Sequence, residues 1–90
     1  MPEVTKEIMV SNRLGIHARP AAALVQRVLA FESDVTISFN GNRVNAKSIM
    51  GLLTLAATRG SRLTVTCKGA DAEATLKAVE ELFASGFGED

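Results

Sequence analysis

The single histidine of the chain, His17, lies in the segment 14–20 (LGIHARP), where an alternating apolar stretch gives way to helical spacing. A helix start offers backbone N–H groups without intrahelical partners and the positive end of the helix dipole, so it favours an anion. Pro20 suits a first helical turn because it lacks an N–H, and Gly15 permits a sharp turn before it. Arg19 adds a cation whose planar fork matches phosphate. The pattern predicts a nucleophilic imidazole that carries a phosphoryl group.

Two other interpretations of His17 follow from its residue type. A histidine near a helix start is commonly a surface or capping residue, and the residues alone leave this alternative open. A metal site is not expected, because one His and one Cys, far apart in the sequence, cannot easily supply three or four clustered ligands.

Cys67 alternates with apolar residues and is expected to be a small core residue. We also expect no cofactor, since the chain has no nucleotide-binding loop.

Ser48 is the second residue with a possible chemical role. Serine is a preferred N-cap and stabilises a helix start by about 1 kcal/mol, which is the simpler interpretation. The alternative is phosphorylation, which would add roughly −1.5 to −2 charges. A helix N-terminus tolerates such a group, so we expect the fold to survive and the effect to fall on partners.

The helix expected from Ser48 to about Thr58 has more apolar residues than one buried face needs. Met50 and Leu55 fall on other faces, and Gly51 leaves a bare position. The surplus indicates either an exposed docking patch, with Met50 as an adaptable contact, or a helix buried on most sides. The residues that can form the core stripe are Ile49, Leu52, Leu53 and Ala56.

The strands and helices that must position these residues are predicted in the order β-α-β-β-α-β-α. Strands are predicted at 4–10, 34–39, 42–46 and 63–67. Helices are predicted from just after His17 to about 31, from 48 to about 58, and from a cap at Asp71 to about 85. Asn40-Gly41 predicts a two-residue hairpin. We therefore expect a single domain over residues 1–90. Its fold class is α+β, an open-faced two-layer sandwich of a four-stranded antiparallel sheet with three helices on one face.

Composition narrows the class of partner. The chain has 10 basic and 10 acidic side chains, no Trp or Tyr and four Phe, so neither a basic surface nor a base-stacking platform for nucleic acid is expected. The charged N-terminus does not resemble a secretion signal, and no apolar run approaches a membrane span of ~20 residues. A single Cys fits a reducing cytoplasm. We expect a cytoplasmic monomer without nucleic-acid or membrane partners.

The segments 15–21 (GIHARPA), Asn40-Gly41 and 45–52 (NAKSIMGL) resemble HPr, the histidine phosphocarrier family of the bacterial phosphoenolpyruvate-dependent phosphotransferase system. The resemblance extends from position 4 to about 86. It implies that His17 accepts a phosphoryl group on Nδ1 from phosphorylated Enzyme I and passes it to a histidine of an enzyme IIA protein. Arg19 would pair with the phosphate, and the backbone N–H groups of Ala18 and Arg19 would hold its oxygens.

The same resemblance implies a regulatory surface around the second helix. Ser48 matches the serine that HPr kinase/phosphorylase modifies with ATP. The residues that match the apolar partner-docking surface are Ile49, Met50, Gly51 and Leu53.

Three functional alternatives remain open on the sequence. The first is a binding module in which phosphorylated Ser48 recruits a transcription regulator, as in relatives that lack the histidine; the joint presence of His17 and Arg19 disfavours this as the only role. The second is a regulatory carrier of the nitrogen branch, because the ending 83–90 (FASGFGED) resembles the relatives called NPr, whereas 47–51 (KSIMG) resembles substrates of the kinase. The third is a stand-alone enzyme, which the lack of paired carboxylates and of a nucleophile–base pair disfavours.

Overall fold

Alternating apolar residues build a four-stranded antiparallel sheet in the computed structural model, which describes residues 1–89. The strand order is β1-β4-β2-β3, so β1 and β3 form the edges. In β4 the side chains of Leu63, Val65 and Cys67 are buried, whereas Arg62 and Thr64 face outward. The strands are β1 (Glu3–Met9), β2 (Asp34–Phe39), β3 (Asn42–Asn45) and β4 (Arg62–Lys68).

The turn between β2 and β3 is the predicted two-residue hairpin. Asn40 and Gly41 have φ angles of 51° and 80°, and Phe39 pairs directly with Asn42. Two successive residues with positive φ give the strands the twist that such a tight hairpin needs. The prediction from the Asn-Gly pair is confirmed.

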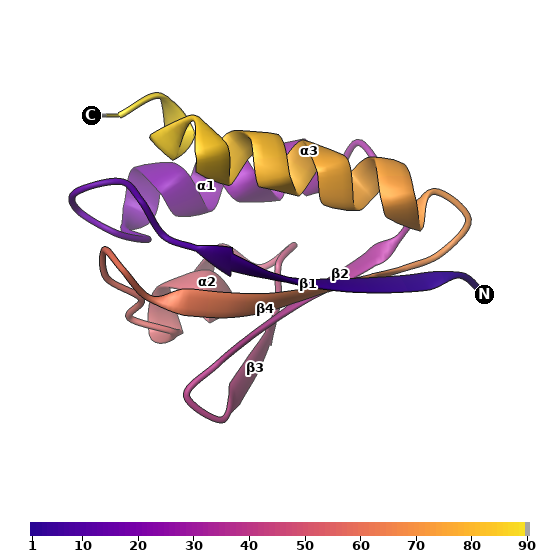
Figure 1. Ribbon diagram of the computed structural model, residues 1–90, viewed down its shortest axis with the longest axis horizontal. Helices are drawn as coiled ribbons and strands as arrows, with labels where there is room; N and C mark the ends of the chain where they lie inside the picture. Colours follow the sequence, from indigo (N-terminus) through magenta and orange to yellow (C-terminus); the bar gives the residue numbers. More distant parts are fainter. Residues whose placement is uncertain (90) are drawn as a thin grey trace.

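Three helices bury their apolar faces against one side of this sheet. In Figure 1, α1 and α3 lie side by side over the sheet, and α2 lies at the end where the segment before α1 and the C-terminal segment also meet. Their buried residues form one core with the inner face of the strands, which confirms the predicted fold class. The helices are α1 (Ala18–Val28), α2 (Ile49–Thr54) and α3 (Ala72–Ala84), followed by a 3₁₀ turn, η1 (Gly86–Gly88).

The second helix is shorter than predicted. It ends at Thr54 rather than near Thr58, because Ala56 has a φ of 52°, and a left-handed residue stops an α-helix. The chain then turns back so that Leu55 and Ala57 enter the core. The predicted core stripe is therefore wrong in part: Ile49 and Ala56 are exposed, and Leu52 and Leu55 fill the interior.

The other two helices also depart in detail from the prediction. The first ends at Val28 rather than near Phe31, and Thr75 takes a fully buried place in α3. The Asp71 carboxylate makes no cap bond to its own helix within the described residues. It accepts instead the N–H groups of Glu32 and Ser33, both at 2.9 Å, and thereby ties the start of α3 to the α1–β2 loop. Hydrogen bonds from Ser33 and Glu32 lower the pKa of Asp71 to about 2.

Candidate functional site

His17 lies at the N-cap of α1, where its backbone is extended (φ −94°, ψ −168°). Gly15, with φ +69°, turns the chain sharply before it. The next residue, Ile16, is buried and donates its N–H to the Ala57 carbonyl at 3.0 Å. This bond joins the loop to the core, while 36 % of the His17 side chain remains exposed. The ring is thus held in place and open to a partner.

Within residues 1–89, the first turn of α1 has backbone N–H groups, on Ala18 and Arg19, that no acceptor occupies, as an anion site needs. The Ala21 N–H reaches the His17 carbonyl at 3.0 Å and closes the first helical turn. The N–H groups of Ala18 and Arg19 come before this bond, in the positions where a helix has no intrahelical acceptors. Pro20, buried in the same turn, has no N–H to satisfy. The predicted backbone site is therefore compatible with the local geometry.

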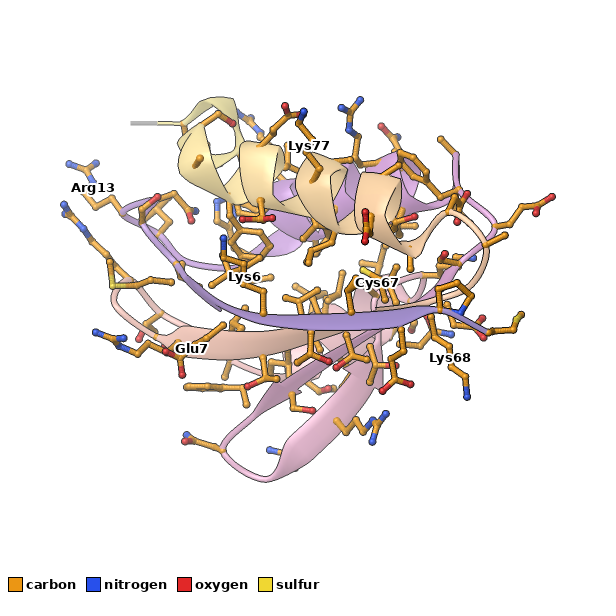
Figure 2. All side chains as sticks on the ribbon, turned by 45° about the vertical axis from the view of Figure 1, so that its right-hand side comes forward. Lys6, Glu7, Arg13, Cys67, Lys68 and Lys77 are labelled. Atoms are coloured by element: carbon orange, nitrogen blue, oxygen red, sulfur yellow. The ribbon has the colours of Figure 1, made fainter. Side chains whose placement is uncertain are left out.

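Arg19 and Arg13 line a common hollow, which reaches His17 only through Glu89, the lining residue that contacts the imidazole. The hollow measures about 350 Å³, and its other lining residues are Leu14, Gly88 and Glu89. Figure 2 shows Arg13 projecting outward from the loop that precedes α1. The two guanidinium groups outnumber the single carboxylate of Glu89 in this lining, so the hollow keeps a net positive charge, which suits a phosphoryl group. Sequence reasoning identified Arg19 but missed Arg13.

Glu89 is a further site residue that the sequence prediction missed. Its Oε2 lies 2.9 Å from Nε2 of His17, and its Oε1 accepts a hydrogen bond from Nδ2 of Asn12 at 3.0 Å. Partial desolvation of the carboxyl favours its neutral form, but the hydrogen bonds from His17 and Asn12 and the charge of Arg19 outweigh it, so the pKa of Glu89 is lowered. The carboxylate that contacts the imidazole is therefore ionised near neutral pH.

The turn η1 brings Glu89 to His17. Phe87 is buried and packs its ring edge against Phe83, with centroids 4.8 Å apart and planes at 68°. Its φ of 58° is unusual for a side-chain-bearing residue, so packing holds the turn in a strained conformation. An apolar residue between Gly86 and Gly88, just after a helix end, is the sequence signal that points to this anchored turn.

Ser48 lies at the N-cap of α2, where its Oγ accepts the Gly51 N–H at 3.1 Å, so the predicted cap is confirmed. Two residues of the predicted docking surface are exposed: Ile49 (40 %) and Met50 (72 %). The other two, Gly51 and Leu53, are half-buried. Because α2 packs beside α1, this surface belongs to the same region of the molecule as the start of α1.

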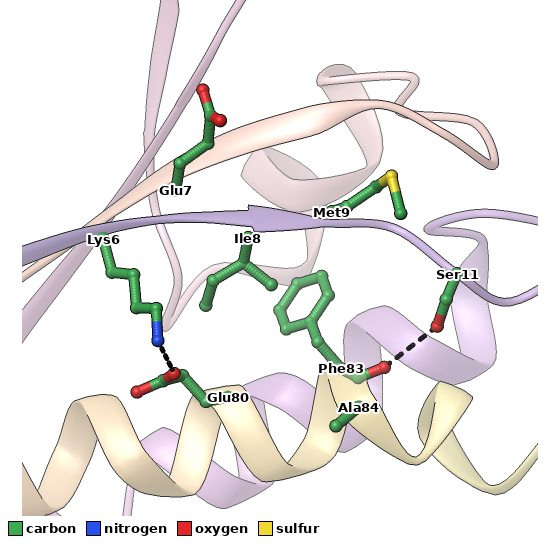
Figure 3. A pocket seen from close by; sticks show the side chains of 8 residues that line it. All are labelled: Lys6, Glu7, Ile8, Met9, Ser11, Glu80, Phe83 and Ala84. Carbon is green, nitrogen blue, oxygen red and sulfur yellow. Dashed lines mark hydrogen bonds and ion pairs between the residues drawn. The ribbon is translucent and has the colours of Figure 1, made fainter.

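A second hollow, also of about 350 Å³, follows the seam between β1 and α3 (Figure 3). Phe83 and Ile8 form its apolar floor, and the ion pair between Lys6 and Glu80 joins its two walls. Its lining residues include neither His17 nor Ser48. The ion pair indicates that this hollow belongs to the packing of α3 on the edge strand.

Cys67 lies in the core, as predicted, with burial and the nearby Asp71 charge raising the pKa of its thiol to about 11. Within residues 1–89, the side chains of His, Cys, Asp and Glu form no group of three that could hold a metal ion. No helix in this part of the chain is long and apolar enough to cross a membrane.

The sequence of the chain matches one protein family over most of its length. Residues 4–85 match the family model described as "PTS HPr component phosphorylation site". The chain is 46 % identical to the phosphocarrier protein HPr of Xylella fastidiosa over 84 residues (93 % of this chain, 94 % of the relative). It is also 46 % identical to HPr of Treponema pallidum over 87 residues (97 % and 99 %).

Solved structures of HPr proteins have the same fold as this chain. The crystal structure of HPr-C-His from Thermoanaerobacter tengcongensis has a TM-score of 0.90 at 41 % identity, covering 100 % of this chain and 99 % of that one. The HPr of Bacillus anthracis has a TM-score of 0.87 at 43 % identity (92 % and 99 %). The fold is that of HPr, a small phosphocarrier of the phosphotransferase system. The chain belongs to the HPr family of the phosphotransferase system, as the sequence resemblance predicted.

Proposed function

We propose that His17 is the residue that carries the phosphoryl group, taken from phosphorylated Enzyme I and passed to a histidine of an enzyme IIA protein in the cytoplasm. The observation that carries this proposal is the half-exposed imidazole at the N-cap of α1, beside a hollow lined by two arginines. Phosphoryl transfer needs alignment and charge stabilisation more than covalent chemistry from the protein. A shallow site on a small fold provides both and leaves room for the partner's active site.

Each neighbouring group has a part in this relay. As the new N–P bond forms, the guanidinium of Arg19 neutralises the phosphoryl oxygens, and Arg13 adds a second positive charge across the hollow. The Ala18 and Arg19 N–H groups donate to the same oxygens from the helix start. The phosphoimidazole remains activated, because a protonated imidazole leaves readily when the next histidine attacks.

The exposed side of α2 is the proposed docking surface for Enzyme I and IIA proteins. Met50 and Ile49 supply flexible apolar contact area close to α1, and Leu53 and Gly51 contribute at its margin. Weak, exchangeable binding suits such a small patch, since a carrier must release each partner after transfer. We propose that the carrier acts as a monomer.

A second function is proposed for Ser48, namely regulatory phosphorylation by an HPr kinase/phosphorylase. Ser48 lies directly before Ile49 and Met50, so a phosphate there would bring about two negative charges to the edge of the apolar patch. An added charge that must be desolvated opposes docking. The chain is also 39 % identical to Bacillus subtilis Crh, whose structure is described as that of a catabolite repression HPr, which favours a role with a transcription regulator as the alternative.

The relay is tested with purified Enzyme I, phosphoenolpyruvate, excess IIA and a catalytic amount of this protein. Phosphate should accumulate on IIA in many turnovers, and His17→Ala should abolish this. Arg19→Ala should slow transfer, whereas Arg27→Ala, which removes an exposed arginine from the far end of the same helix, serves as the matched control. Equal rates for the two arginine variants would contradict the role of Arg19.

The Ser48 proposal has its own test. Ser48→Asp should load His17 from Enzyme I at least several-fold more slowly through a raised KM, because the charge acts on docking. Thr54→Asp, at the other end of α2, is the control for an added charge on this helix. A Ser48→Asp variant that loads as fast as the unmodified protein would refute the proposal.

A further inference from the structure

The contact between Glu89 and His17 determines which nitrogen of the imidazole is free. Both carboxylate oxygens face Nε2, at 2.9 and 3.2 Å. An ionised carboxylate can only accept hydrogen bonds, so Nε2 must carry the proton that fills this contact. In the neutral ring the lone pair is then on Nδ1. The pairing makes Nδ1 the nucleophilic nitrogen and covers Nε2.

The carboxylate is itself held from two sides. Nδ2 of Asn12, a fully buried side chain, donates to Oε1 of Glu89 at 3.0 Å and to the Gly15 carbonyl at 2.7 Å. The packing of Phe87 on Phe83 anchors the turn that precedes Glu89. Only 14 % of the Glu89 side chain is exposed. Its position is therefore set by the loop before α1 and by the end of α3 together.

We propose that Glu89 is a positioning residue for phosphoryl transfer: its carboxylate fixes the Nε2–H form of His17 and presents Nδ1 to the phosphoryl donor. This inference rests on the proposed function of His17. When the Nδ1–P bond forms, the ring becomes cationic and keeps its Nε2 proton. The Glu89 carboxylate then stabilises the positive charge, in the way that a buried carboxylate supports the histidine of a catalytic triad. Glu89 never contacts the phosphorus, so it acts through His17.

The first test uses phosphoramidate, which needs no protein partner. The ring lone pair forms the N–P bond while the P–N bond of phosphoramidate breaks, and ammonia leaves with the electron pair; the ring keeps its other proton and becomes cationic. NMR coupling between phosphorus and the ring protons then identifies the modified nitrogen. The unmodified protein should react on Nδ1 alone.

Three variants decide the interpretation. Glu89→Ala uncovers Nε2, so a product phosphorylated on Nε2 should appear. Glu89→Gln keeps an acceptor oxygen and should retain the Nδ1 product. Glu73→Gln removes one negative charge from an exposed position at the other end of α3 and should behave as the unmodified protein. A Glu89→Ala protein that gives only the Nδ1 product at an unchanged rate would overturn the proposal.

The second test measures loading from Enzyme I and separates this inference from the proposed function. Glu89→Ala should lower kcat by about 10-fold, the lower end of the loss seen when a metal-bound histidine loses the partner that orients it. KM should stay unchanged, because Glu89 is not on the α2 docking surface, and Glu89→Gln should recover part of the rate. Enzyme I could load none of the proteins while phosphoramidate still phosphorylates Nε2 in Glu89→Ala. That result would support the positioning role of Glu89 and refute the proposed relay from Enzyme I. Equal kcat in Glu89→Ala and the unmodified protein overturns the positioning role and leaves the relay intact.

Discussion

Replacing Gly15 with alanine should damage the site through the backbone alone. Gly15 has a φ of +69°, which costs a residue with a Cβ about 1–2 kcal/mol. The added Cβ would also lie 2.4 Å from the Ala57 carbonyl oxygen and 2.9 Å from Cα of Thr58. Both are backbone atoms, so the segment must move.

The movement breaks a specific bond. The Ala57 carbonyl accepts the Ile16 N–H at 3.0 Å, and losing this buried hydrogen bond costs about 1 kcal/mol. With about 1–2 kcal/mol for the displaced packing, Gly15→Ala should destabilise the protein by about 4 kcal/mol. A shift of the His17 loop by about 1 Å should also slow loading by up to about 100-fold.

Gly60→Ala is the matched control for this variant. Gly60 also has a positive φ, of 91°, but its added Cβ would meet no atom within 4 Å among the described residues. Gly60→Ala should lose about 1–2 kcal/mol of the free energy of unfolding, from the cost of a positive φ alone, and should load His17 normally. Urea unfolding followed by circular dichroism gives both free energies of unfolding. Equal destabilisation of the two variants would refute the steric part of the reasoning, and normal loading by Gly15→Ala would refute the link to His17.

Three further results are expected. Phe87→Ala should reduce the free energy of unfolding by about 3 kcal/mol, measured by urea titration, whereas exposed Leu29→Ala should change it little; equal effects would show that the turn is not packed. The pKa of Asp71 is lowered from 3.8 to about 2. The ionised Asp71 carboxylate therefore adds to the free energy of unfolding above about pH 4, and this stabilisation is lost as the pH falls towards 2. The Tm of the unmodified protein should therefore fall more steeply over that interval than that of Asp71→Asn, and parallel curves would count against the contact with Ser33. Because burial raises the pKa of Cys67 to about 11, iodoacetamide at pH 8 should modify it only in urea; rapid modification of the folded protein would contradict its burial.

Sequence patterns predicted the parts of the fold that depend on local rules. Alternation in the segment 63–67 placed the inner face of β4, and Asn40-Gly41 placed the hairpin. The Gly, His, Arg and Pro of the segment 15–20 predicted the turn and helix start that the structure shows. Each of these features follows from backbone preferences or from periodicity within a few residues.

The features that escaped prediction depend on contacts between distant parts of the chain. Glu89 bonds to His17 across 72 residues, and Asp71 binds Ser33 across 38 residues in addition to Thr75 of its own helix. The left-handed Ala56 stops α2 so that Leu55 and Ala57 can enter the core, a choice that tertiary packing makes against local helical spacing. The spacing of residues in the sequence predicts neither these two contacts nor the end of α2, because each depends on how the helices lie on the sheet.

The most direct test of the central claim is the intact mass of the protein after incubation with phosphoenolpyruvate and Enzyme I, with His17→Ala in parallel. If His17 is the carrier, the unmodified protein gains one acid-labile phosphate, located on Nδ1 of His17, and the variant gains none. An acid-labile phosphate that persists on His17→Ala would contradict the central claim. So would the absence of phosphate from the unmodified protein when the same Enzyme I loads a competent carrier.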